Sequence, residues 1–318
     1  MSTETATARG PVAPGRPAAP RRRGVRHHLR ENLIAFCYLV PGLAVFVVFM
    51  FWPLVRSVVL SFQGTDIIGR PGAFIGWQNY QHLFSDPDFA KVLATTGGFT
   101  LLTVIPSILL SLVIALLLQG RIRAVRFFRT SFALPFAFSV ATASVIFQVL
   151  YNPASGILNG LLSYVGLGPI NWLTDPGWAL FSVSMATVWM QLGYNLLILS
   201  AGLGAVPEDT LEAARLDGAR GWRLQRSIII PLITPQLFFL VVTGTIQSLQ
   251  SFGQIYILTR GGPEGRTTTL VYSIYEQAFA YNNSNFGYAS AQALVLLVVV
   301  LIITGIQFGV LERRVFYR

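Results

Sequence analysis

The stretch PEDTLEAARLDGARGWRLQRSIIIPLITP, residues 207–235, separates two long apolar runs of this 318-residue chain. Pro207 suits the first turn of a helix, and the acidic residues that follow it favour the positively polarised N-terminal end. Gly218 can end that helix in a left-handed cap. A second helix over about 221–230 would then lead into the next apolar run. The stretch therefore predicts two short helices that form a compact protrusion.

The apolar runs on either side of this protrusion extend through the whole chain. Hydrophobic residues make up 53% of the sequence and charged residues only 11%, whereas a soluble domain carries about a quarter charged residues. Runs of about 20 apolar residues are long enough to cross a bilayer. We therefore predict an all-α membrane protein whose six transmembrane helices lie at 33–52, 92–118, 128–150, 178–204, 232–252 and 289–311.

The N-terminal segment differs in composition from the rest. Residues 1–30 are rich in Ala, Pro, Gly, Thr and Arg, and such a segment cannot bury a core, so we predict a disordered basic tail. The first apolar run is too long for a signal peptide and has no cleavage site after it, which indicates an uncleaved span. The predicted organisation is this tail, then a membrane domain over 31–318 with a cytoplasmic loop at 205–235.

Basic residues predict the orientation in the membrane. The tail, the loop after the second span, the loop after the fourth span and the C-terminus hold seven, four, four and three of the 23 basic residues, 18 together, and the opposite side holds five. Positive charge favours the cytoplasmic side, so both termini are predicted to be cytoplasmic. The net charge of +10 therefore reports topology, and we expect no nucleic-acid partner, since no groove-reading element is visible.

Within 207–235 the spacing of several residues resembles a known signature. Glu212-Ala213-Ala214, Asp217-Gly218-Ala219 and Ile228-x-Ile230-Pro231 with Pro235 are similar to the EAA motif of binding-protein-dependent ABC permeases. Downstream, FGQIYILTRGGP at 252–263 resembles the sugar and glycerol-phosphate branch of that family. Many relatives have Asp where Gly253 stands. The likeness covers about residues 33–314.

This resemblance implies a fold, a set of partners and a cell membrane. The fold would be the MetI-like six-helix bundle in the bacterial inner membrane. The partners would be a second similar permease subunit, two copies of a cytoplasmic ATPase, an extracellular solute-binding (lipo)protein and membrane lipid. The chain has no GxxxxGK[ST] phosphate loop, so it is expected to be no enzyme and to bind no cofactor, with ATP used by the partner. The residues that would couple to the ATPase are Glu212, Ala213, Ala214, Asp217 and Gly218.

Polar residues in the fourth and fifth spans are candidates for a solute path, because polar groups avoid lipid. Gln247, Ser251 and Gln254 recur at three- and four-residue steps, which would align them on one helix face. Amides and hydroxyls suit sugar hydroxyls, although the same residues can instead join helices to one another. The predicted path residues, some of them implied by the family resemblance, are Gly193, Tyr194, Asn195, Gly244, Gln247, Ser248 and Ser251.

Other kinds of function leave little trace in the sequence. Cys37 is the only cysteine and the three histidines lack ligand spacing, so neither a catalytic nor a metal site is predicted. A secondary transporter is the alternative from another class; it would need ionisable residues within the spans. The solute is predicted to be a sugar or oligosaccharide, with glycerol 3-phosphate or a glycerophosphodiester as the alternative.

Overall fold

The computed structural model describes residues 25–66, 69–119, 125–280 and 284–312. The predicted tail is therefore outside the described residues up to position 24, and a helix begins at Val25, inside the segment predicted as tail. The chain divides into two compact units, Met1–Val55 and Arg56–Arg318, and each is described by itself.

The first unit is helical throughout its described part. Helix α1 (Val25–Phe46) passes through one π-helical turn (Val47–Phe51) into α2 (Trp52–Ser61), which continues into the second unit. The segment Phe36–Ser61 is long and apolar enough to cross a membrane. The first span thus runs about nine residues further than the predicted 33–52.

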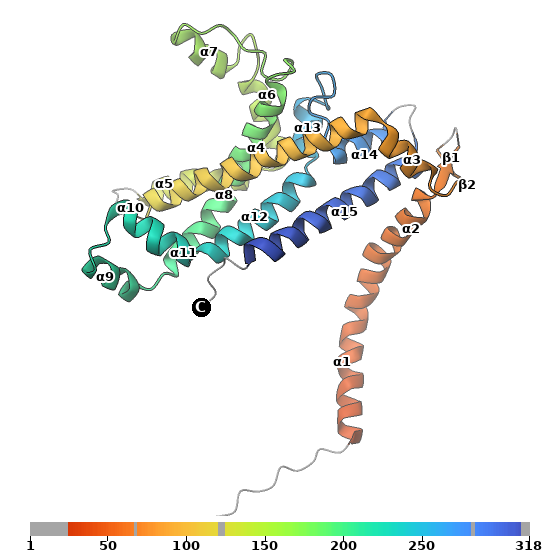
Figure 1. Cartoon of the computed structure of the whole chain (residues 1–318), viewed down its shortest axis with the longest axis horizontal. Coiled ribbons are helices and arrows are strands. Elements are labelled where there is room, and N and C mark those ends of the chain that lie inside the picture. Colours follow the sequence, from red (N-terminus) through yellow and green to blue (C-terminus); the bar gives the residue numbers. More distant parts are fainter. Residues whose placement is uncertain (1–24, 67–68, 120–124, 281–283, 313–318) are drawn as a thin grey trace, which may run out of the picture. The chain divides into compact units, whose positions relative to one another are not determined.

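The second unit holds the remaining helices and one small hairpin (Figure 1). Its elements in chain order are β1 (Gln63–Thr65), β2 (Pro71–Phe74), α3 (Gln78–Ser85), α4 (Pro87–Leu117), α5 (Val125–Ala133), a 3₁₀ turn (Leu134–Ala137), α6 (Val140–Leu150), α7 (Ile157–Tyr164), α8 (Ala179–Gly204), α9 (Glu208–Leu216), α10 (Gly221–Leu224), a π-helical turn (Gln225–Ile229), α11 (Ile230–Leu232), α12 (Thr234–Leu249), α13 (Gly253–Leu258), α14 (Leu270–Phe279) and α15 (Phe286–Leu311).

Two of the predicted spans are broken helices. Four described helices can cross a membrane singly, and the pairs Val125–Ala137 with Val140–Leu150 and Gly221–Leu232 with Thr234–Leu249 are bent by 104° and 67°. Counting each pair as one crossing gives the six predicted. The third and fifth spans, predicted at 128–150 and 232–252, are each such a bent pair. Pro135 and Pro235 lie beside the two breaks, and each lacks the N–H that a continuous helix needs.

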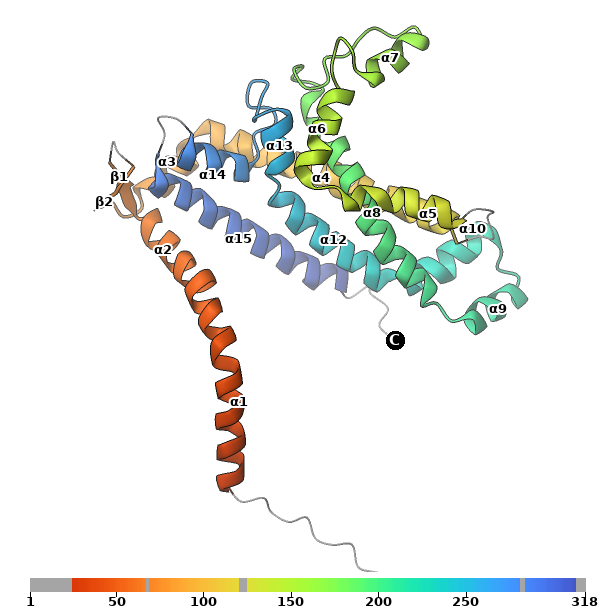
Figure 2. The same ribbon diagram turned by 180° about the vertical axis from the view of Figure 1, so that it is seen from behind.

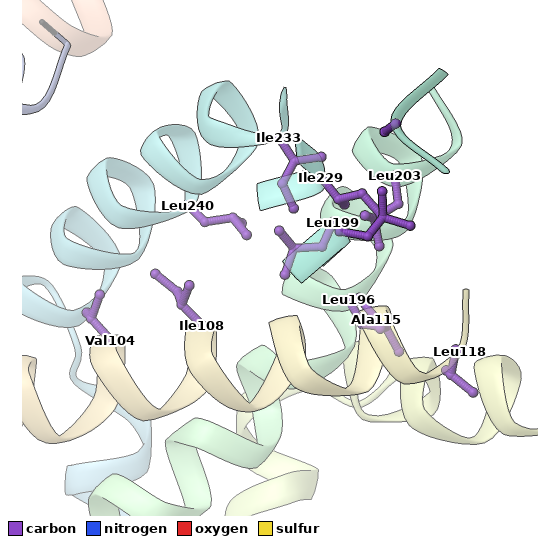
Figure 3. Packing of buried hydrophobic residues seen from close by; sticks show 12 residues of the cluster. Val104, Ile108, Ala115, Leu118, Leu196, Leu199, Leu203, Ile229, Ile233 and Leu240 are labelled. Atoms are coloured by element: carbon purple, nitrogen blue, oxygen red, sulfur yellow. The ribbon is translucent and has the colours of Figure 1, made fainter. Parts of the chain in front are cut away.

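The core of the second unit lies between α4, α8 and α12. Buried Ile108 of α4, Leu199 of α8 and Leu240 of α12 belong to one cluster, and side chains from the protrusion after α8 join it (Figure 3). Helices α4 and α8 make the most extensive contact of the unit. The cluster therefore connects the membrane helices directly to the predicted coupling segment.

A stripe of small hydroxyl residues follows the buried face of α4. We call it the hydroxyl stripe. The threonine hydroxyls donate to carbonyls of the preceding turn of α4, as in Thr103 Oγ1 to Phe99 O at 2.6 Å. Two bonds reach α8, from Ser107 Oγ to Gln191 Oε1 at 3.2 Å and from Ser111 Oγ to Leu192 O at 3.3 Å. Small residues allow close helix packing in membranes. The stripe consists of Thr96, Thr100, Thr103, Ser107 and Ser111.

One end of the second unit carries short elements that were predicted only as loops. The hairpin β1–β2 is antiparallel, and Thr65 Oγ1 donates to Asn285 Oδ1 at 3.1 Å at the start of α15. Helices α13 and α14 lie near the same end, opposite α9 (Figures 1 and 2). Burial, with Glu276 nearby, raises the pKa of Tyr272 in α14.

Candidate functional site

Helix α9 forms the protrusion that the sequence predicts, and its C-terminal end is a Schellman motif. The amide of Gly218 donates to Arg215 O at 3.1 Å and that of Ala219 to Ala214 O at 2.9 Å. Gly218 has a φ of 84°, the left-handed conformation that glycine adopts without penalty. The left-handed cap predicted at this glycine is confirmed, and it fixes where α9 turns toward α10.

The residues assigned to coupling lie on two faces of the protrusion. Ala214 is buried in the core cluster, with Leu211 packed beside it. Glu212, Ala213, Asp217 and Gly218 are exposed. Ala214 therefore fastens α9 to the bundle, while the other four face away from it.

Two large apolar side chains of the protrusion are unusually exposed, and sequence reasoning missed them. Leu216 is 89% and Trp222 69% exposed. Leu216 lies two residues beyond buried Ala214, on the opposite side of the helix, which a helical projection of α9 could have indicated. Exposed apolar groups rimmed by polar residues are typical of a protein–protein contact.

A cavity of about 590 Å³ lies where the break in the third span and the turn between α12 and α13 meet α8. Its wall includes Phe138, at the break before α6, and Gln250 and Ser251, between α12 and α13. Irregular backbone at membrane depth is tolerated where it is buried in protein or lines a water-filled cavity. The break in the third span and the turn between α12 and α13 thus line the cavity, whereas the bend of the fifth span at Ile233 lies in the core cluster.

The lining of this cavity combines polar, uncharged side chains with apolar ones. Among the described residues that form it, none is Asp, Glu, Lys or Arg. Amides and hydroxyls can hydrogen-bond a neutral polar solute, and aromatic faces can pack on an apolar one. The amide and hydroxyl groups come from Thr187, Gln191, Gln247, Gln250, Ser251 and Gln254, and the aromatic rings from Phe136, Phe138, Tyr194 and Phe252.

The amides divide into two kinds. Gln254 is buried and donates through Nε2 to Ser251 Oγ at 3.0 Å and to Thr187 Oγ1 at 3.3 Å, while Gln191 accepts from α4. Gln247 and Gln250 are exposed to the cavity, and their side chains make no hydrogen bond to another described residue. Two amides therefore join helices, and two are available to a solute.

The predicted alignment of Gln254 with Gln247 on one helix face was wrong. Helix α12 ends at Leu249, and Gln254 belongs to α13. The two side chains meet at the cavity because the chain turns between these helices.

Of the predicted path residues, Tyr194, Gln247 and Ser251 line the cavity. The other four lie outside its lining. A Cβ on Gly193 would lie 2.6 Å from Ala133 O, so this glycine permits the close approach of the third span to α8. Gly244 faces Val104 of α4. Asn195 is buried, and Ser248 is fully buried with no partner for its hydroxyl among the described residues.

These features define a class of protein. The chain has up to six membrane-spanning segments, a cavity that offers uncharged amide and hydroxyl groups is lined by the third, fourth and fifth of them, and a capped helix protrudes at one end of the second unit. Among the described residues, no cluster of three metal-ligating side chains is present. The arrangement is that of a membrane transport subunit.

Comparison with known proteins identifies the family. Residues 99–317 match the binding-protein-dependent transport system inner membrane component. The chain belongs to this family, and it is a permease subunit of an ABC importer with the MetI-like fold. This membership decides against a secondary transporter.

Two kinds of relatives agree with this assignment. The chain is 36% identical over 290 residues to the sn-glycerol-3-phosphate transport system permease protein UgpA of Agrobacterium fabrum, covering 90% of this chain and 97% of that one. It is 33% identical to UgpA of Escherichia coli (strain UTI89 / UPEC), with 91% and 97% covered. In fold it is similar to a chain of a bacterial alginate ABC transporter, solved in complex with a periplasmic protein that holds an alginate pentasaccharide, with a TM-score of 0.77, 21% identity, and 91% and 97% covered.

Proposed function

We propose that this permease forms, with a second similar subunit, the path for an uncharged sugar or oligosaccharide that an extracellular binding protein delivers. The observation that carries the proposal is the cavity lining, in which free amides stand beside aromatic rings and no lining residue described is charged. Each hydroxyl of a sugar can donate to and accept from a side-chain amide. Sugar rings also present apolar faces that pack on aromatic rings.

The energy for transport would come from two copies of a separate ATPase. The exposed face of α9, with Glu212, Ala213, Asp217 and Gly218, is the surface that we assign to ATPase contact, and Leu216 and Trp222 extend it. Ala214 supports this surface from within. This chain binds no cofactor in the proposed mechanism, since ATP is bound and hydrolysed by the partner.

Glycerol 3-phosphate is the second candidate, because the relatives at 33–36% identity are named for it. A phosphate dianion inside a membrane needs cationic groups or several aligned N–H donors. The described lining supplies no cation, so the neutral solute is favoured.

Reconstitution of the complete transporter tests the substrate. The chain, its partner permease, the ATPase and the binding protein would be placed in proteoliposomes, and uptake and ATP hydrolysis measured with neutral oligosaccharides and with glycerol 3-phosphate. We expect a neutral oligosaccharide to stimulate both and glycerol 3-phosphate to stimulate neither. Stimulation by glycerol 3-phosphate alone would replace the first candidate by the second. The purified chain alone is expected to hydrolyse no ATP.

Reporter fusions test the proposed orientation in the inner membrane. Because 18 of the 23 basic residues lie on one side, a reporter at Arg318 is expected to be cytoplasmic and one after Gly262 external. The reverse pattern would reject the orientation.

A further inference from the structure

We propose that a crevice at the α9 end of the second unit binds the headgroup of an anionic, hydroxyl-bearing phospholipid such as phosphatidylglycerol. The crevice has a volume of about 160 Å³ and lies between the C-terminal ends of α4 and α8 and the helix α5. Its described lining is Ala115, Gln119, Arg129, Ser200, Leu203 and Gly204.

Arg129 supplies the charge for a phosphate. It is exposed, and among the described residues it has no carboxylate within ion-pair distance. A guanidinium can hold a phosphate through two parallel N–H···O bonds. Basic pockets between membrane helices on the cytoplasmic side are typical sites for anionic lipid headgroups.

Helix α5 begins the third span, and Arg129 lies in its second turn, close to the basic loop that the sequence places on the cytoplasmic side. Phe127 is 67% and Phe128 42% exposed, with ring centroids 5.7 Å apart, so this end of the helix presents apolar rings as well as basic side chains. An arginine near the end of a membrane helix can extend its guanidinium toward the headgroups. Arg129 can therefore reach a lipid phosphate from the end of the span.

Gln119 favours a headgroup that carries a hydroxyl. Its Oε1 is buried and has no hydrogen-bond partner among the described residues. A buried acceptor without a donor is unfavourable, and because the Gln119 side chain lines the crevice, a rotation of its amide would offer this oxygen to a ligand hydroxyl, which would then bind more tightly. A glycerol headgroup supplies such hydroxyls beside its phosphate, whereas a choline headgroup supplies none.

Occupancy of this crevice would act on the coupling segment. Ala115 and Leu203 line the crevice and also belong to the core cluster that contains Ala214 of α9. A bound headgroup would therefore brace the α9 attachment. This consequence rests on the proposed role of α9, whereas the binding itself does not.

Lipid retention by the purified transporter complex tests the binding. The complex would be exchanged into mixed phosphatidylglycerol and phosphatidylcholine, and the lipids that remain bound after detergent extraction counted by native mass spectrometry. We expect wild type to retain phosphatidylglycerol selectively and Arg129→Gln to lower that retention about five-fold, the effect of one arginine at a lipid surface. Arg126→Gln is the matched control, because Arg126 is exposed on the same helix but does not line the crevice.

Further arms identify the ligand. Gln119→Leu should reduce the preference for phosphatidylglycerol over phosphatidic acid, which has no headgroup hydroxyl, and inorganic phosphate should not displace the bound lipid. Equal loss in both arginine variants, or displacement by inorganic phosphate, would overturn the proposal. So would a fall in melting temperature of the lipid-free Arg129→Gln complex with unchanged lipid retention, since Arg129 would then only stabilise the ends of α4 and α8. Absence of sugar-stimulated turnover would reject the proposed function and leave this retention unchanged.

Discussion

The protrusion and the cavity are built in opposite ways. The protrusion uses consecutive residues, and its cap, its buried face and its exposed face all follow from the order of residues within 207–235. The cavity collects side chains from Pro135 to Gln254, from α8, the break in the third span and the turn after α12. Local rules decide the first region, and contacts distant in sequence decide the second. Substitutions in the two regions should therefore fail in different ways.

The largest expected effect is on ATPase capture by the protrusion. Burying a leucine side chain contributes about 1.5–3 kcal/mol, so Leu216→Ala should weaken ATPase binding about ten-fold or more. The melting temperature of the chain should stay unchanged, because Leu216 is 89% exposed. Co-purification of the ATPase measures the effect. Tyr164→Ala is the control, since Tyr164 on α7 is 91% exposed away from α9; equal loss in both variants would contradict the assignment.

Near the cavity, a single added methyl group should lower the stability of the chain. In Gly193→Ala the new Cβ would meet Ala133 O at 2.6 Å and Phe136 Cβ at 3.0 Å. Overpacking of this kind costs about 1–3 kcal/mol. We expect a lower melting temperature and yield. Gly97→Ala in α4 serves as the control, because nothing lies within 4 Å of its Cβ position. If the two variants melt alike, the close approach of the third span to α8 is not required.

Substitutions of Gly218 in the cap of α9 should be limited by backbone conformation and not by steric clash. No atom lies within 4 Å of a Cβ at Gly218, yet its φ is 84°. Gly218→Val should therefore destabilise the cap by about 1–2 kcal/mol and reduce uptake, with membrane insertion unchanged. Gly218→Asn should keep most of the uptake, since asparagine tolerates this conformation. Equal uptake by the valine and asparagine variants would remove the cap from the mechanism.

The smallest effects should separate the two kinds of amide. Gln247→Leu removes an amide with no described protein partner. The solute would lose one or two hydrogen bonds, each worth about 0.5–1.5 kcal/mol, so uptake per complex should fall. Gln254→Leu removes the bonds to Thr187 and Ser251, so the melting temperature should fall instead. Measuring uptake and melting for both variants checks this. Loss of stability in Gln247→Leu with normal uptake would make it a helix-joining residue.

The sequence predicted the local features better than the assembled ones. Gly218 was recognisable as a cap because glycine after a helical run carries that meaning by itself. The number of spans followed from apolar length. The bends did not, because Pro106 lies within the unbroken α4 whereas Pro135 lies beside a break, and neighbouring helices decide between these outcomes. The role of Gly193 likewise depends on Ala133, sixty residues earlier in the chain.

The hydroxyl stripe of α4 has a mechanical consequence. Its three threonines donate to carbonyls of their own helix, so those bonds are independent of where α8 stands. Only the bonds of Ser107 and Ser111, at 3.2 and 3.3 Å, connect the described stripe to α8. Sliding α8 along α4 would break these two bonds, and the small side chains offer little steric resistance. Packed helices that slide past one another are a known route of domain closure. The contact between α4 and α8 is therefore suited to sliding. The three threonine hydroxyls of the stripe keep their hydrogen bonds wherever α8 lies along α4.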